Sequence, residues 1–375
     1  MGLIALAVAL LIEQLRPLRP DNRLHRLARD GVDLARQHSR TDRPFDAVIA
    51  WFAVVAGSIV LVLALQWVAA AIGSLASFLL HVGILYLTVG FRQFGQQLRE
   101  ILAAIERDEL GQAGRLLDEW IDAGEGRVSA SGVYRDDAAY PPGRIRLCRA
   151  TITHALVCAH RELFGPILAY LLLPGAIGPV AYRMVDLLAR RWSDADATEV
   201  DIEFDTEVGT GFAEAVPGGP GGAGESPAAD IEPDIDARGF EPPGIDNAHA
   251  GVAVRGLRIV DWIPLRVTAA GFAIAGDFED ATYCWRAAIA AGAGHDQRAM
   301  LVAMGGGALG LDLIDPDRDR YWAGDPADAD AGSFDWSAAP PDAAGIRSTI
   351  GMIWRAATLV VGLFVLVSLS SWLGS

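Results

Sequence analysis

The strongest constraint on this chain is an apolar run over residues 47–72 that contains no charged residue. As a helix, a run of this length crosses the hydrocarbon core of a bilayer, which is about 30 Å thick. Gly73 and Ser74 interrupt it, and a second apolar run follows at 75–91. Together these runs predict a transmembrane hairpin over residues 47–91.

Three further apolar runs lie outside this hairpin. The run over 2–12 is too short to cross a bilayer unaided and could form half of a longer, tilted helix. Residues 350–373 predict a C-terminal transmembrane helix within 346–375. The run over 163–182 holds five helix-breaking residues, so we expect a broken or re-entrant segment buried among other helices. These five are Pro166, Pro174, Gly175, Gly178 and Pro179.

The arginines predict the orientation, because cytoplasmic loops of membrane proteins are enriched in basic residues. Residues 13–46 hold eight arginines and residues 92–162 hold ten, whereas the turn at 73–74 holds none. Both arginine-rich segments are therefore expected on the cytoplasmic side of the cell inner membrane, with the hairpin turn outside. The sequence predicts a multi-pass protein that contacts the lipid bilayer.

Acidic residues are concentrated in one segment. Residues 194–236 contain 13 acidic and no basic residues, and Gly, Pro and Ala dominate 209–230. Such a composition buries too little apolar surface to offset the entropy of ordering. We predict a disordered insertion over 193–250, which is either a solvated linker or a site for an unknown protein partner.

These patterns predict an all-α, polytopic membrane protein with amphipathic cytoplasmic helices and the acidic insertion. Residues 1–192 form the first helical region, residues 251–345 a second region of the same domain, and 346–375 the last membrane helix. A net charge of −16 argues against nucleic-acid binding. All 31 basic residues are arginines, so the lysine of a Walker A loop and Schiff-base chemistry are excluded.

Few residues suggest a metal or catalytic site on their own. His154 and Cys158 share one helical face without a third ligand, so we predict a structural role and no metal site. His81 is interpreted as a polar contact between helices. The glycines at 305–307 favour close helix packing over a phosphate loop. The aspartates at 312, 315, 317 and 319 form a cluster, but Asp317 and Asp319 alternate with Arg318 and Arg320, which favours pairing among these residues over magnesium binding.

Several segments resemble the CobD/CbiB family of membrane proteins of cobalamin biosynthesis. LHRLARDGVDL at 24–34 (with His25), YLTVGFRQFGQQLREI (with Arg92) and GPILAY at 165–170 are similar to family segments. AYRMVD at 181–186 and GGALGLDL at 306–313 are the closest matches.

The resemblance implies adenosylcobinamide-phosphate synthesis, in which ATP drives amide ligation of adenosylcobyric acid, a corrinoid, to aminopropanol phosphate. It would require ATP and magnesium. By this resemblance Asp186, Arg92 and Arg183 would be catalytic, and His25 and Tyr182 would bind substrate.

The polar motif of the family is mostly missing. Its Glu-Ser-x-x-Glu-Asn-x-x-Asp-Gly stretch falls on Thr153, His154, Val157, Cys158, Arg161 and Glu162. Arg161 replaces an acid and could not hold a cation. The sequence therefore leaves two hypotheses: the ligase, with ligands from elsewhere, or a non-catalytic AmpE-like membrane protein without a cofactor, in envelope signalling or as a partner subunit.

Overall fold

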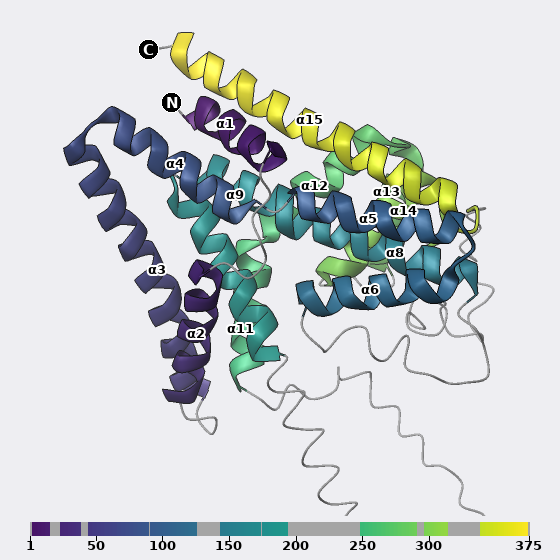
Figure 1. Cartoon of the computed structure of the whole chain (residues 1–375), viewed down its shortest axis with the longest axis horizontal. Helices are drawn as coiled ribbons and strands as arrows, with labels where there is room; N and C mark the ends of the chain where they lie inside the picture. The colour runs from purple at the N-terminus through teal and green to yellow at the C-terminus, as the bar shows by residue number, and fades with distance from the viewer. Residues whose placement is uncertain are drawn as a thin grey trace, which may run out of the picture.

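The computed structural model describes residues 2–15, 23–38, 44–89, 91–125, 143–173, 175–193, 248–290, 296–313 and 338–373. These residues form an all-α structure, which confirms the all-α part of the predicted fold class (Figure 1). Within them, pairing of extended backbone is limited to one isolated parallel bridge between Leu311 and Ala339. The predicted insertion lies outside the described residues except at its ends, because helix α11 already begins at Ala248.

Helices α3 (Pro44–Ile72) and α4 (Ser74–Thr88) form the predicted hairpin. Gly73 turns the chain with a φ of 146°, a region that side chains other than glycine rarely adopt. However, the 15 residues of α4 span only about 22 Å at 1.5 Å per residue. The second arm is thus shorter than a full crossing, and it packs against the short apolar helix α1 (Gly2–Leu15).

Within the described residues, three helical segments are long and apolar enough to cross a membrane. They are Phe45–Ile72, Arg144–Leu172 and Ala343–Ser368. The last belongs to α15 (Ala343–Leu373), so a helix long and apolar enough to cross a membrane lies where the C-terminal membrane helix is predicted. The most apolar part of the first is 11% buried within the protein and that of the second is 78% buried. The first segment therefore exposes most of its apolar surface, whereas the second is the centre of the bundle.

The central segment corrects the boundaries predicted for residues 163–182. It consists of α8 (Arg144–Ala159), a π-helical turn η1 (His160–Phe164) and α9 (Gly165–Leu172). After a turn at 175–176, a further helix covers 177–193. The predicted break is confirmed, but the membrane-length helix begins at Arg144 because its buried polar residues interrupt the hydropathy pattern without interrupting the helix.

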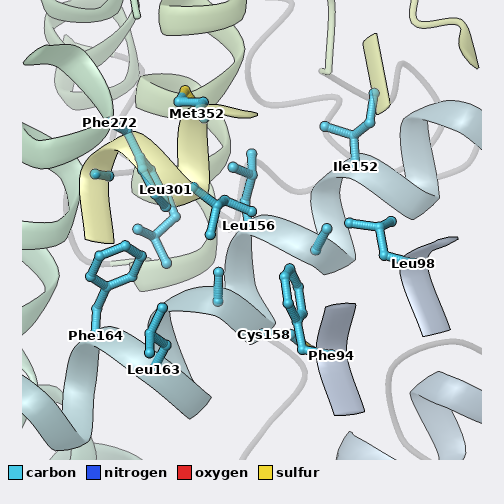
Figure 2. Close-up of a cluster of buried hydrophobic side chains, with 14 of the residues drawn as sticks. Phe94, Leu98, Ile152, Leu156, Cys158, Leu163, Phe164, Phe272, Leu301 and Met352 are labelled. Atoms are coloured by element: carbon cyan, nitrogen blue, oxygen red, sulfur yellow. The ribbon is translucent and has the colours of Figure 1, made fainter. Parts of the chain in front are cut away.

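The main hydrophobic core surrounds α8. Figure 2 shows Leu156 of α8 beside Leu301 of α14 (Gln297–Leu309) and Leu98 of α5 (Phe91–Glu106) pointing toward α8. Helix α5 is amphipathic, with Leu98 and Ile101 buried and Arg99 exposed. Helix α6 (Leu110–Glu125), α12 (Trp262–Ala275) and α15 complete this layer.

The glycines of α14 serve helix packing, as predicted. A Cβ atom added at Gly305 would lie 2.5 Å from Leu156 Cδ1. One added at Gly307 would lie 2.5 Å from the backbone oxygen of Asp280 in α13 (Phe278–Ala290). Only a residue without a side chain allows the backbones of α13 and α14 to approach this closely.

A second, smaller core lies around the first half of α3. It joins α2 (Arg23–His38), α11 (Ala248–Val260) and the helix over 177–193 to α3 through Val32, Ala50, Val185, Trp192 and Leu257. Figure 1 shows α2 and α11 beside the lower end of α3. The segments before and after residues 194–247 therefore pack against each other.

Candidate functional site: a polar cluster around Asp186

The candidate site is built by two neighbouring helical segments with unusual local geometry. The π-helical turn η1 contains His160, Arg161 and Glu162. Such turns widen an α-helix locally and are frequent at functional sites. Tyr182, Asp186 and Arg190 follow at intervals of four residues in the helix over 177–193, so they lie on one face of it.

Asp186 is the centre of the cluster and is only 2% exposed. Its Oδ2 atom accepts a hydrogen bond from Arg190 Nη2 at 2.7 Å and lies 3.8 Å from Arg183 Nη1. Its Oδ1 atom lies 3.9 Å from Arg161 Nε. Burial by itself raises the pKa of Asp186, but the charges of Arg190, Arg161 and Arg183 outweigh burial and leave the pKa below its ordinary value.

Arg183 connects the cluster to the end of the hairpin. Its Nε donates to the backbone oxygen of Thr88 at 2.7 Å, and its Nη2 donates to the backbone oxygen of Glu162 at 3.4 Å. Thr88 is the last residue of α4, where helix carbonyls lack intrahelical partners. Arg183 thus satisfies this carbonyl while it contributes charge beside Asp186.

A second polar group lies next to the first and is linked through Tyr182. His160 Nε2 lies 2.8 Å from Asp261 Oδ1, and both side chains are almost completely buried. The Tyr182 hydroxyl donates to the same oxygen at 3.1 Å. On its other side, His160 Nδ1 lies 2.9 Å from the hydroxyl of Thr268 in α12. These contacts fix α12 against η1 and the helix over 177–193.

The structure brings together three of the five residues implied by the resemblance. Tyr182, Arg183 and Asp186 stand in one cluster. Arg92 lies in the first turn of α5 and His25 in α2, but their side chains are outside the described part of the structure. The sequence interpretation missed Arg190, His160 and Asp261 as members. The sequence could have pointed to Asp261, because it is the single acidic residue among residues 248–276.

The charges of the cluster suit an internal ion-pair network. Three arginines face Asp186, and Glu162 also lies within the electrostatic range of Arg183 and Arg190. No group of three or more His, Cys, Asp or Glu side chains is placed to hold a metal ion among the described residues. A magnesium ion at Asp186 would meet three guanidinium groups, so the residues present here do not fit the ion that the resemblance implies.

The other polar candidates have structural contacts. Cys158 Sγ lies 3.2 Å from His154 Nε2, and His154 also packs edge-on against Trp120. His81 lies 3.2 Å from the Tyr170 hydroxyl and 3.3 Å from Gln66 Nε2, so it joins three helices as expected. Arg149 Nη2 lies 3.1 Å from Asp312 Oδ2, which joins α8 to the segment after α14. The aspartates at 315, 317 and 319 lie outside the described residues.

No protein-family model, curated protein or solved structure matches this chain.

Proposed function

We propose that the chain is a non-catalytic, AmpE-like multi-pass membrane protein that acts by binding, in envelope signalling or as a partner subunit. One observation carries the proposal: the carboxylate that the resemblance makes catalytic is 2% exposed and faces three arginines. A group so enclosed has no free face for a magnesium ion or a reacting carboxyl group.

The other two carboxylates nearby also have partners within the protein. Asp261 contacts His160 and Tyr182, and Glu162 lies near Arg183 and Arg190. A ligase that activates a carboxyl group with ATP needs free carboxylates for magnesium and free cations for phosphate. Here acids and bases neutralise one another and join η1, α4, α12 and the helix over 177–193. This arrangement supports a structural role for the cluster.

One observation favours the ligase as the second candidate. Tyr182, Arg183 and Asp186 belong to the best-matching segment of the resemblance, and they lie together beside two further arginines, Arg161 and Arg190. In this alternative the arginines would exchange Asp186 for a phosphate or an activated carboxylate of the substrate.

A turnover measurement distinguishes these candidates. The protein in nanodiscs receives adenosylcobyric acid, aminopropanol phosphate and Mg-ATP, and mass spectrometry follows the corrinoid. We expect no mass gain under conditions in which an active CobD/CbiB-family enzyme forms the amide. A mass gain equal to the amide product, lost in Arg183→Ala, would overturn the non-catalytic proposal and establish the ligase.

We further propose a location in the cell inner membrane with the arginine-rich segments in the cytoplasm. All three cysteines are buried, so cysteines introduced at exposed positions report topology with little background. Cys284 should react least with a maleimide, because burial both limits access to its thiol and raises the pKa of that thiol to about 12.

The topology test uses Ser74→Cys at the hairpin turn and Gln37→Cys on α2, both at exposed positions. A membrane-impermeant maleimide is expected to label Ser74→Cys in intact spheroplasts and Gln37→Cys only after permeabilisation. The unsubstituted protein should remain unlabelled in both conditions. The reverse pattern would show that the arginine-rich segments lie outside.

A further inference from the structure

The bend between α11 and α12 carries a surface that neither the core nor the polar cluster uses. We infer that this surface binds the headgroups of anionic phospholipids at the cytoplasmic membrane interface. It is called the elbow surface and comprises Arg255, Arg258, Ile259, Trp262, Ile263 and Arg266.

The elbow surface combines exposed apolar and basic side chains. Ile259 is 77% exposed, Trp262 54% and Ile263 45%. The guanidinium carbon of Arg266 lies 4.0 Å from the centre of the Trp262 ring, which is a cation–π contact. Tryptophan with arginine is the combination that proteins place at membrane–water interfaces, where the ring enters the acyl boundary and the cation meets the headgroups.

The charged side chains of the elbow surface are all arginines. Residues 248–276 contain three arginines and one acidic residue, Asp261. Asp261 points inward to His160 and Tyr182 and is 2% exposed, so it does not neutralise the surface. The same inward contact holds the bend in place and directs Trp262 and Ile263 outward. An anionic ligand is therefore complementary to this face.

Two sets of contacts place the elbow surface near the ends of the hairpin helices that adjoin the arginine-rich segments. Tyr182 bonds to Asp261 in the bend, and its neighbour Arg183 bonds to the carbonyl of Thr88, where the apolar helix α4 ends. The bend therefore lies near the end of α4 that is remote from the hairpin turn. On the adjacent side, a Cβ atom added at Gly256 would lie 2.5 Å from Trp51 in the first third of α3. Both contacts are near the arginine-rich ends of the hairpin helices.

Lipid binding to the full-length protein tests the inference. Phosphatidylglycerol or phosphatidylcholine is titrated into the protein in a neutral detergent, and native mass spectrometry gives the dissociation constant of the first bound lipid. A basic side chain near an anionic surface contributes about 1 kcal/mol, which corresponds to about fivefold in affinity. The double variant Arg258→Gln/Arg266→Gln is expected to lose about 25-fold in affinity for phosphatidylglycerol and to keep its affinity for phosphatidylcholine.

A matched control removes the same charge elsewhere. Arg107, in the turn after α5, and Arg286, on α13, are exposed away from the elbow surface, so Arg107→Gln/Arg286→Gln should retain the wild-type preference for phosphatidylglycerol. Arg258→Lys/Arg266→Lys keeps both positive charges and should retain most of the preference for phosphatidylglycerol. This variant separates the effect of lost charge from the effect of lost folding.

The inference is overturned if wild-type protein binds both lipids equally, as it would if the acidic residues 194–236 covered these arginines. An equal loss in the control variant would overturn it as well. The inference rests on the proposed membrane location but not on the lack of turnover. Since the lipid titration contains no corrinoid or ATP, its outcome is independent of the turnover test.

Discussion

Asp186→Asn is expected to lower the free energy of unfolding by about 3 kcal/mol, near the lower end of the cost of breaking a buried ion pair. The substitution preserves the size of the side chain and removes its charge, so Arg161, Arg183 and Arg190 lose the one carboxylate that faces all three. Their side chains are 25%, 26% and 15% exposed, and partial hydration keeps the cost from being larger. Thermal or denaturant unfolding in detergent, compared with wild type, measures the difference.

Asp33→Asn is the matched control. Asp33 pairs with Arg191 at 2.9 Å, but both side chains are about two-fifths exposed, at 43% and 39%. Exposed pairs of this kind contribute about 0–1 kcal/mol. A similar loss of stability in both variants would contradict the view that the three arginines depend on Asp186.

The effect of Asp186 should also depend on pH in a defined direction. Because the arginines hold the pKa of Asp186 below its ordinary value in the folded protein, its ionisation stabilises that state. This contribution is fully present above the unfolded pKa, at about pH 4, and is lost as the pH falls through the lower folded value. The stability difference between wild type and Asp186→Asn should therefore be constant near neutral pH and shrink in acid.

The long apolar helices were predictable because their signal is local. Length and hydropathy of consecutive residues predicted α3 and α15, and Gly73-Ser74 predicted the hairpin turn. The start of the central segment was missed for the same reason. Thr151, Thr153 and His154 lower its hydropathy, although all three are buried inside the bundle and do not face lipid. Polarity alone does not reveal whether a helix is surrounded by lipid or by protein.

The polar cluster was predictable only in part because its contacts are distant in sequence. Tyr182, Arg183 and Asp186 lie in one short segment, and the resemblance pointed to them together. By contrast, His160 and Asp261 are 101 residues apart, and Tyr182 and Asp261 are 79 apart. No periodicity connects positions across such separations. The solitary acid in an otherwise apolar and basic stretch was the one available indication of Asp261.

Gly307→Ala is expected to destabilise the protein by about 1–3 kcal/mol, the usual cost of adding atoms to a packed core. The new methyl group would lie 2.5 Å from the Asp280 oxygen and 2.7 Å from Ala281 Cα, both of which are backbone atoms. Backbone cannot move aside as a side chain would, so α13 and α14 must separate. This cost exceeds the helix propensity that alanine gains over glycine, which is about 1 kcal/mol.

A glycine-to-alanine substitution at Gly351 should instead stabilise the protein. This glycine lies in the middle of α15, is exposed, and has nothing within 4 Å of an added Cβ atom. Gly351→Ala therefore keeps the propensity gain without the clash and should raise stability by up to about 1 kcal/mol. Unfolding of both variants in the same detergent gives the comparison. If Gly307→Ala were neutral, the close approach of α13 and α14 would not be needed for stability, and the packing role of the glycines at 305–307 would be wrong.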